Sequence, residues 1–235
     1  MQVTLLSFTK DAEILCAAAA LGCNSEDPAE KITLTDAKVT KILDQTIKSG
    51  HHSILEHATF TFSVSGVSRV LTHQLVRHRM ASYSQQSQRC ASPTKPSFVM
   101  PNSINTNVHD DWQNNAQDSF EFAMGVAWGT YSKLIEAGVP EEDARYVLPG
   151  ACTTNIVITM NARELLHFFE LRMCNRAQWE IREMANQMYM LCFVKAPNIF
   201  KHAGPKCWTG KCTEMKPCGH PPTKVEFEDK SYIFH

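Results

Sequence analysis

The sequence predicts a mixed α/β fold of the α+β kind, in which a single helix-rich domain surrounds a mixed β-sheet. Two observations predict this class. Short runs in which polar and apolar residues alternate, as in strands, stand among longer segments whose apolar residues recur at helical spacing. In addition, the 235-residue chain is 43% hydrophobic and 20% charged, which provides enough apolar side chains for a core and too many for a disordered chain.

The first fifty residues predict one strand and two helices. Residues 2–8 alternate like a short strand. Asp11 has the residue type and position of a helix N-cap, and the alanine-rich segment after it predicts a helix that runs to Gly22. A second helix is expected over residues 36–48, with Gly50 as its stop.

The next sixty residues predict a strand, a helix and a long loop. Residues 58–65 alternate and are rich in aromatic and β-branched side chains, so they predict a strand with one polar face. Gly66 is expected to end this strand, and residues 67–78 predict a helix. Residues 82–108 are rich in Ser, Gln, Asn and Pro and predict a loop that holds at most one short strand.

The second half of the chain predicts three helices and one strand. A long amphipathic helix is expected over residues 111–136, and Gly138 is expected to stop it. Residues 155–159 are largely β-branched and predict a core strand. Two further helices are expected over residues 161–174 and 177–193.

The end of the chain differs from the rest in composition. From Pro197 onward it is rich in Pro, Gly, Lys and Cys and shows no strong periodicity. We therefore expect one domain over residues 1–200 and a loose, cysteine-containing tail over residues 201–235.

Residues 57–109 have an unusual charge pattern, because they contain no Asp or Glu. At the frequency of the whole chain, this segment should hold about five acidic residues. Its basic residues are Arg69, Arg77, Arg79, Arg89 and Lys95. Since a solvated surface normally mixes charges of both signs, the segment indicates a bound anion. The alternative is that acidic residues from elsewhere in the fold balance these cations.

The spacing of the cations supports an anion site. On a helix that starts at residue 67, Arg69, His73 and Arg77 fall at positions i, i+4 and i+8 and form one stripe. This stripe leads into a Ser- and Gln-rich loop over residues 77–89. Guanidinium groups, hydroxyls and the backbone N–H groups of such a loop suit phosphates and the carbonyls of a uracil-like base.

Several motifs together resemble one enzyme family. Arg77-His78-Arg79, followed after seven residues by Ser87, resembles the signature of flavin-dependent thymidylate synthases. Further segments resemble that family in the same order along the chain: GHHSILEH at residues 50–57, ARYVLP at 144–149, NARELLH at 161–167, and Leu171-Arg172 followed by AQWE at 177–180. Because the matches keep their order over roughly residues 1–200, the chain is identified as a member of this family.

The resemblance implies an activity, cofactors and an assembly. It implies methylation of dUMP at C5 to give dTMP, with 5,10-methylenetetrahydrofolate as the carbon donor and tetrahydrofolate as a product. It implies NADPH as the reductant, acting through FAD. It also implies the family's own fold and a homotetramer whose active sites are shared between subunits.

The resemblance also assigns residues to the two ligands. The positions that correspond to FAD contacts are Ser53, Arg77, His78, Arg79, Gln85, Asn161, Ala162, Arg163 and His167. The positions that correspond to dUMP contacts are Gln74, Leu75, Val76, Arg77, Gln85, Gln86, Ser87, Gln88, Arg89, Arg145 and Arg172. The many cations suit a pyrophosphate, an anionic reduced flavin and a phosphate dianion in a partly desolvated cleft.

Arg172 is the residue for which the resemblance implies a catalytic role. It would polarise the uracil ring and favour loss of the N3 proton; a guanidinium cannot act as a base, but it can stabilise an anion. By itself, Arg172 could simply be a helix-end cation paired with a nearby Glu. Arg163 and Arg172 are nine residues apart and would point to opposite sides of one helix. They would serve two different sites unless the helix ends before Arg172.

Two positions depart from the pattern of some relatives, and a third, Ser87, could be mistaken for a nucleophile. Gln85 stands where others carry Glu, and His167 stands where others carry Asn. Histidine and asparagine can both form a hydrogen bond to a flavin or adenine edge. Ser87 has no Asp near it in the sequence, so it is interpreted as a substrate contact and not as a nucleophile.

The tail contains Cys207, Cys212, Cys218 and His220, which are soft metal ligands. Their spacing does not form the tight pairs of common zinc modules, so a reduced tail without metal is expected. A bound metal or a disulfide staple remains the alternative.

Composition limits the other possibilities. A net charge of −1 does not favour a nucleic-acid coat, and no run of about 18 apolar residues predicts a membrane span. Nine cysteines and the lack of a recognisable secretory signal predict a cytoplasmic protein. The alternative function is a non-enzymatic nucleotide- or nucleic-acid-binding module that uses the basic segment 57–109, with salt-sensitive affinity and no chromophore.

Overall fold

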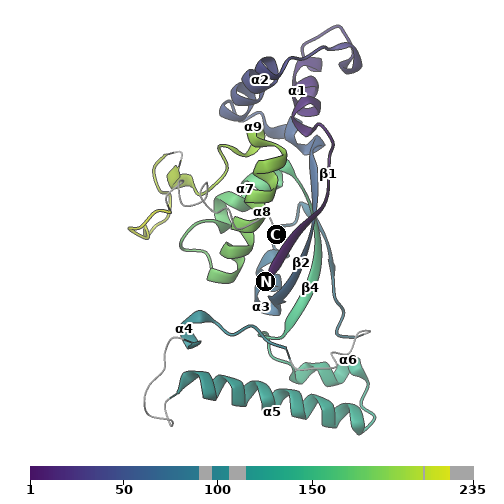
Figure 1. The fold of residues 1–235 in the computed structure, drawn as a ribbon, viewed down its shortest axis with the longest axis vertical. Helices are drawn as coiled ribbons and strands as arrows, with labels where there is room; N and C mark the ends of the chain where they lie inside the picture. The colour runs from purple at the N-terminus through teal and green to yellow at the C-terminus, as the bar shows by residue number, and fades with distance from the viewer. Residues whose placement is uncertain (90–96, 106–114, 209, 223–235) are drawn as a thin grey trace. The chain divides into compact units, whose positions relative to one another are not determined.

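The computed structural model describes residues 1–89, 97–105, 115–208 and 210–222, and it has the predicted mixed α/β class (Figure 1). The strands are β1 (Gln2–Phe8), β2 (Thr59–Ser68), β3 (Ala81–Gln85) and β4 (Thr153–Asn161). The longer helices are α1 (Ala12–Gly22), α2 (Asp36–Lys48), α5 (Ala116–Glu136), α7 (Ala162–Arg172) and α8 (Trp179–Lys195). The shorter helices are α3 (Arg69–Leu75), α4 (Asn102–Asn105), α6 (Glu141–Ala144), α9 (Pro197–Phe200) and the 3-10 helix η2 (His52–His57).

The strands form one four-stranded sheet with the order β1-β2-β4-β3. The described residues fall into two compact units. The larger unit contains residues 3–63, 76–83 and those from 157 onward, and the smaller unit contains residues 1–2, 64–75 and 84–156. Each unit is described below by itself.

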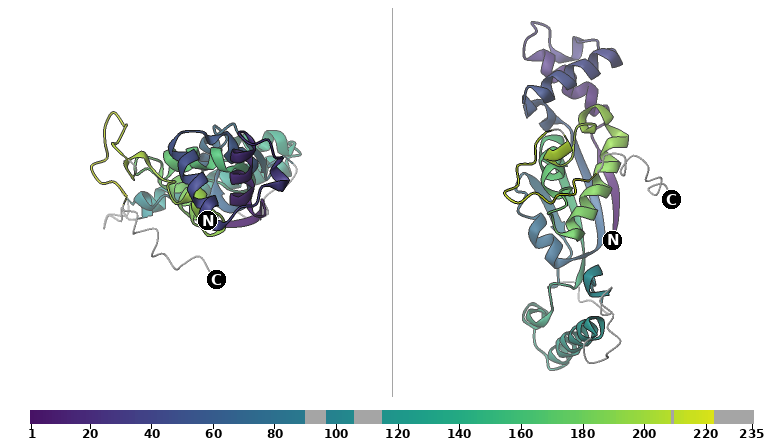
Figure 2. Two further views of the ribbon diagram at one scale, coloured as in Figure 1. Left: turned by 90° about the horizontal axis from the view of Figure 1, so that it is seen from above. Right: turned by 90° about the vertical axis from the view of Figure 1, so that its left-hand side faces the viewer.

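The core of the larger unit is rich in aromatic rings. Phe200 of α9 packs edge-on against Phe60 of β2, with a centroid distance of 5.4 Å, and against Phe169 of α7 at 5.9 Å. Tyr189 of α8 packs against Phe169 and thereby extends this cluster. Around it, α1 and α2 lie side by side and α9 packs against α2 (Figures 1 and 2). The cluster therefore fixes the direction in which α7 leaves the sheet.

The smaller unit contains the long helix α5, which begins at an Asn115 cap. The Asn115 Oδ1 accepts hydrogen bonds from the backbone N–H groups of Gln117 and Asp118. Of the 21 residues of α5, only Tyr131 is buried, whereas Phe122 is 74% exposed. The predicted start at residue 111 lies outside the described residues.

The predicted boundary between strand and helix near Gly66 is wrong. Strand β2 continues through Gly66, which takes a positive φ of 68°, and the helix begins only at Arg69 and ends at Leu75. The physical reason is a cap, because Ser68 Oγ accepts a hydrogen bond from Leu71 N at 3.0 Å. Arg77 therefore lies beyond the helix and does not continue the stripe of Arg69.

Asp11 takes the predicted N-cap position, and helix α1 starts where expected. Asp11 adopts a left-handed conformation with φ 51°, and its side chain accepts no capping hydrogen bond. The other predicted helices and strands occur close to their predicted positions, whereas the short helices α4, α6 and α9 are not predicted from the sequence. The short strand expected after residue 82 is β3. Within the described residues, no helix is both long and apolar enough to cross a membrane.

Candidate active site

Helix α7 begins at the end of strand β4 and carries several predicted site residues. Its N-cap is Asn161, whose Oδ1 accepts a hydrogen bond from the Glu164 backbone N–H at 2.9 Å. Arg163 and His167 are four residues apart and share one side of the helix. The helix runs through Arg172, so the possibility that it ends earlier is excluded. Arg163 and Arg172 thus lie on opposite sides of one helix.

A cavity of about 1110 Å³ lies in the larger unit, beside the first turns of α7. Asn161, Arg163 and His167 line it, as the sequence predicts for a cofactor site. The other basic and imidazole groups on its wall come from the end of α2, from η2 and from the segment after α9: Lys48, His52, His202 and Lys206. The volume is at the upper end for ligand pockets, which leaves room for a dinucleotide.

The cavity wall combines polar and apolar side chains, and its carboxylates have partners. Arg163 donates a hydrogen bond to Glu56 Oε1, and Lys206 Nζ lies 3.1 Å from Glu170 Oε1. Both pairs are partly exposed, so water or a bound anion can compete with them. The cations of this wall are thus held in place and still accessible.

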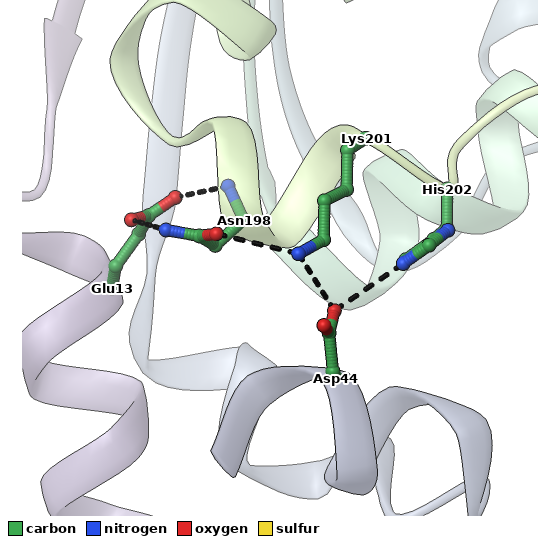
Figure 3. A network of polar contacts seen from close by, with 5 residues as sticks. All are labelled: Glu13, Asp44, Asn198, Lys201 and His202. Carbon is green, nitrogen blue, oxygen red and sulfur yellow. Dashed lines mark hydrogen bonds and ion pairs between the residues drawn. The ribbon is translucent and has the colours of Figure 1, made fainter. Parts of the chain in front are cut away.

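A polar network holds one side of the cavity against helices α1 and α2. Figure 3 shows its five residues: Glu13, Asp44, Asn198, Lys201 and His202. Asp44 lies 2.8 Å from Lys201 Nζ and 3.3 Å from His202 Nε2, and the hydrogen bond from Lys201 is the main reason why the pKa of Asp44 is lowered. Asn198 donates hydrogen bonds from its backbone and its side chain to Glu13. The network positions the chain that leads into His202.

A glycine lets an aromatic ring close the rim of the cavity. Gly204 has φ 136°, and a Cβ added there would lie 2.1 Å from the Trp208 ring. Only glycine therefore permits this close approach. Trp208 also donates a hydrogen bond from Nε1 to the Pro222 carbonyl and packs edge-on near Tyr189. Residues expected in the tail thus contribute to the cavity wall.

His78 lies between a carboxylate and the predicted catalytic arginine. Its Nδ1 is 3.0 Å from Glu164 Oε1, and its Nε2 accepts a hydrogen bond from Arg172 Nε at 3.0 Å. Burial lowers the pKa of His78 despite the Glu164 partner, and burial together with the nearby Arg77 lowers the pKa of Arg172. The guanidinium still remains charged at neutral pH.

The smaller unit holds most of the predicted substrate residues. Gln85 Nε2 donates hydrogen bonds to Thr72 Oγ1 and Thr154 Oγ1, so its amide is fixed. Ser87 Oγ accepts a hydrogen bond from the Arg89 backbone N–H at 3.0 Å. The predicted dUMP contacts in this unit are Gln74, Leu75, Gln85, Gln86, Ser87, Gln88, Arg89 and Arg145, whereas Val76, Arg77 and Arg172 belong to the larger unit.

Three arginines gather in the smaller unit. Arg89 forms an ion pair with Glu142 at 2.8 Å, and Arg145 Nε donates to the Glu142 carbonyl. Arg69 donates from Nη2 to the Gln86 carbonyl, while its buried Nε has no hydrogen-bond partner among the residues described. Burial and the nearby Arg145 lower the pKa of Arg69. A buried donor without a partner next to a second cation suits an anionic ligand such as a phosphate.

The predicted site residues differ in their exposure. Arg77, Arg79 and Ser53 are exposed, and Asn161 is partly exposed. Leu75 and Ala162 are fully buried, so neither residue exposes surface that a ligand could contact in this structure. His78 is 5% exposed and both of its ring nitrogens have protein partners, so a flavin contact through its side chain is not what this geometry favours.

The sequence interpretation did not assign several residues of the larger unit to the site. Lys48, Lys206 and Trp208 line the cavity, and Glu164 binds His78. From the sequence, residues 207–220 were considered only as a source of soft metal ligands. Among the described residues, no group of three or more His, Cys, Asp or Glu side chains is arranged to hold a metal ion. Asn175 and Arg176 donate hydrogen bonds to backbone carbonyls of His220 and Lys216.

The residues around the cavity fit an FAD cofactor. Arg163, Lys48 and Lys206 supply cations for a pyrophosphate, and the start of helix α7 adds the positive end of its dipole. Trp208, Leu166 and Ile47 supply apolar surface for flat rings. A helix start, several cations and an apolar wall in one large cavity form a suitable arrangement for a dinucleotide.

Comparisons with known proteins show which sequences and which fold this chain resembles. Residues 4–198 match the family model described as thymidylate synthase complementing protein. A flavin-dependent thymidylate synthase of Geobacter sulfurreducens is 47% identical over 220 residues, with 91% of each chain covered. One of Clostridium tetani is 43% identical over 232 residues, again with 91% of each chain covered. The fold resembles that of a UMP/dUMP methylase, PolB from Streptomyces cacaoi, with a TM-score of 0.74 at 24% identity over 85% of this chain and 93% of that chain.

Proposed function

Because the chain belongs to the family of flavin-dependent thymidylate synthases, we propose that it converts dUMP to dTMP by reductive methylation at C5. The carbon comes from 5,10-methylenetetrahydrofolate and the reducing equivalents from NADPH through FAD, so that tetrahydrofolate and NADP⁺ are the other products. Formally, C5 loses one proton and gains a methylene group and a hydride, and the two folate nitrogens that release the methylene take up this proton and one more from solvent. The observation that carries the proposal is helix α7, which has Arg163 and His167 on the cavity wall and Arg172 on its opposite side.

We propose that the cavity of the larger unit binds FAD. Bound FAD supplies the hydride chemistry that no side chain can provide. Arg163, Lys48 and Lys206 neutralise the cofactor phosphates, and Asn161 and His167 provide hydrogen bonds that orient its rings. The predicted contacts Arg77 and Arg79 are exposed cations that bind the cofactor from other positions of the assembly.

On the substrate side, the arginines of the smaller unit bind the phosphate of dUMP. The hydroxyl of Ser87 can donate to a phosphate oxygen, and Arg69 beside Arg145 adds positive charge. Gln85 is held by two threonines, so its carbonyl oxygen is left to accept a hydrogen bond from the base. Arg172 stabilises the negative charge that develops on the uracil ring when the N3 proton leaves.

We propose a homotetramer with shared active sites. The two sides of α7 then border two different sites, which explains why Arg163 and Arg172 point in opposite directions. Helix α5 supports an assembly, since Phe122 and Val126 on it are 74% and 53% exposed. Large exposed apolar side chains on one helix mark a contact surface. The proposed location is the cytoplasm, and the proposed division is a domain over 1–200 and a tail over 201–235 whose first residues complete the cavity wall.

The comparisons do not support the alternative of a non-enzymatic nucleotide- or nucleic-acid-binding module. The acid-free segment 57–109 also finds an acidic partner from elsewhere in the chain, since Glu142 pairs with Arg89. The fold therefore balances part of its charge.

The proposal is tested on the purified full-length chain. We expect a yellow protein whose flavin absorbance bleaches under anaerobic NADPH and which forms dTMP from dUMP and methylenetetrahydrofolate. Bleaching without dTMP would indicate a different flavoprotein on this scaffold. A colourless chain that stays inactive after reconstitution with FAD would contradict the proposed function.

A further inference from the structure

We propose that Glu164 and His78 are positioning residues that orient the Arg172 guanidinium for its action on the substrate. This inference rests on the proposed function of Arg172. The three side chains form one hydrogen-bonded chain in the larger unit, from Glu164 Oε1 through His78 to Arg172 Nε, with two contacts of 3.0 Å.

Hydrogen-bond chemistry determines the tautomer of His78. The Nε atom of an arginine can only donate, so His78 Nε2 must be the unprotonated acceptor. The proton of the neutral ring then sits on Nδ1, from which it is donated to the carboxylate of Glu164. The carboxylate therefore selects the one ring tautomer that can hold Arg172.

The surroundings keep this arrangement rigid. His78 and Glu164 are 5% and 9% exposed, and the edge of the Phe168 ring packs against the imidazole at a centroid distance of 4.9 Å. Tyr83 donates a hydrogen bond from its hydroxyl to the His78 carbonyl at 2.8 Å, which fixes the backbone as well. Hydrogen bonds in such a weakly polar environment are stronger than in water.

The hydrogen-bonded chain of Glu164, His78 and Arg172 leaves part of the Arg172 guanidinium available to the substrate. Its Nε is occupied by His78, so the flexible side chain is restrained while the two Nη groups remain to bind a substrate carbonyl. A misplacement of a positioned catalytic group by about 1 Å can lower the rate about 100-fold. Loss of the His78 acceptor should therefore reduce kcat without removing any ligand contact.

The charges around His78 explain why it stays neutral. The groups that act on it are Glu164 and His167 of α7 and Arg172 at the end of α7, and Arg77 acts in turn on Arg172. Burial, Arg172 and His167 favour the neutral ring, whereas Glu164 favours the protonated ring, and the pKa lies below its usual value. As the pH falls through this lowered pKa, Nε2 gains a proton and can no longer accept from Arg172.

Two substitutions of His78 form a matched pair. His78→Gln keeps an acceptor for Arg172 and a donor for Glu164, whereas His78→Phe keeps the aromatic volume and removes both. We expect His78→Phe to lose about 10- to 100-fold in kcat, with flavin occupancy and the KM for dUMP nearly unchanged. We expect His78→Gln to recover most of the loss and to lack the acid limb of the wild-type kcat–pH profile.

A spectroscopic measurement tests the tautomer without any activity. In ¹⁵N-histidine-labelled wild type, with the His78 signals assigned by their absence from His78→Gln, we expect the ring to be neutral and protonated on Nδ1 at pH 7.5. Glu164→Leu should shift this ring toward the Nε2–H tautomer and lower kcat by a similar factor, whereas Glu164→Gln, which keeps an acceptor, should have a smaller effect.

Several outcomes would overturn the inference. Folded, flavin-loaded His78→Phe with kcat within about twofold of wild type would do so, and so would an Nε2–H tautomer in the wild type. If His78→Phe does not fold, the tautomer measurement and Glu164→Leu still decide the question. Wild type that makes no dTMP yet shows the Nδ1–H tautomer would contradict the proposed function and leave the hydrogen-bonded chain intact.

Discussion

Arg172 shows how a single side chain can be both charged and held in the fold. It is half-buried, its Nε donates to His78, and burial together with the nearby Arg77 lowers its pKa. A guanidinium tolerates these conditions because its pKa starts so high that it remains protonated. At the residue scale, a fixed positive charge is therefore the main feature of the site.

Arg172→Ala should retain FAD and nearly abolish dTMP formation. Arg172 does not line the cavity assigned to FAD, and removal of one preorganised donor to a developing anion typically costs about 100- to 1000-fold in kcat. The measurement is dTMP formation at saturating dUMP together with the flavin absorbance of the purified variant. Loss of flavin from a variant that is still folded would show that Arg172 belongs to the cofactor site.

Arg79→Ala should weaken FAD binding. Arg79 is an exposed cation between buried His78 and the segment that leads into β3, so its removal should leave the fold intact. A cation that balances a phosphate contributes about 1.5–3 kcal/mol, which corresponds to a roughly 10- to 100-fold weaker affinity. Flavin content after dialysis measures this, with Arg182→Ala on α8 as a control. Full flavin occupancy in Arg79→Ala would assign the residue to structure or to substrate.

At the scale of elements, the start of α7 connects stability with ligand binding. Asn161 ends strand β4, caps α7 through its Oδ1 and lines the cavity. The same residue thus ends strand β4, starts helix α7 and lines the cavity that we propose for the cofactor. Such a dual role is typical of a helix start that binds an anion.

Substitutions of Asn161 should separate its two roles. Asn161→Ala should lower the free energy of unfolding by about 1 kcal/mol, because the cap is lost, and should also weaken FAD binding. Asn161→Asp keeps an acceptor for the Glu164 N–H, so its stability should remain near wild type while its new negative charge lowers FAD affinity. Denaturant unfolding and flavin titration measure the two effects. Equal flavin affinity in all three proteins would remove Asn161 from the cofactor site.

The contact between α2 and the segment after α9 should depend on pH. The hydrogen bond from Lys201 lowers the pKa of Asp44 below 3.8, so its stabilising contribution is present above that pH and is lost as the pH falls through the lowered value. Because the pair is partly exposed, Asp44→Asn should cost less than about 1 kcal/mol. Unfolding curves at pH 7 and pH 3 should differ less for Asp44→Asn than for wild type. An unchanged pH dependence would show that the pair adds nothing to stability.

At the scale of the whole molecule, the two sides of α7 predict active sites built from more than one chain. A mixture of inactive Arg172→Ala and inactive Arg79→Ala, under conditions that exchange subunits, should regain part of the dTMP activity, because some mixed tetramers contain an intact site. Native mass spectrometry establishes that hybrids form. If proven hybrids stay inactive, both arginines act on one site from a single chain.

The sequence predicts much of this molecule, and the failures have physical causes. Periodicity predicts the α/β class and the order of helices and strands, because both depend on local patterns of burial. It misplaces the start of α3, since a single serine cap at Ser68 outweighs the expected effect of Gly66. The motifs predict Asn161, Arg163 and His167 on one cavity, and the structure places them there.

The sequence does not predict contacts between residues that lie far apart along the chain. Glu164 binds His78 across 86 residues, so the acid-free pattern around His78 could not reveal its carboxylate. Likewise, Lys206 and Trp208 lie in a segment without periodicity. The close approach of Trp208 to Gly204 and the contacts of Asp44 position this segment at the cavity. Only the fold brings such residues together.

The most direct test of the central claim is a single turnover under anaerobic conditions. The protein-bound flavin is reduced by one equivalent of NADPH, and dUMP and methylenetetrahydrofolate are then added while flavin absorbance and dTMP are both measured. We predict that the oxidised flavin spectrum returns and that one dTMP forms for each flavin reoxidised, with both changes absent if dUMP is omitted. A reduced flavin that stays reduced with both substrates present, or dTMP that forms without flavin reoxidation, would contradict the account.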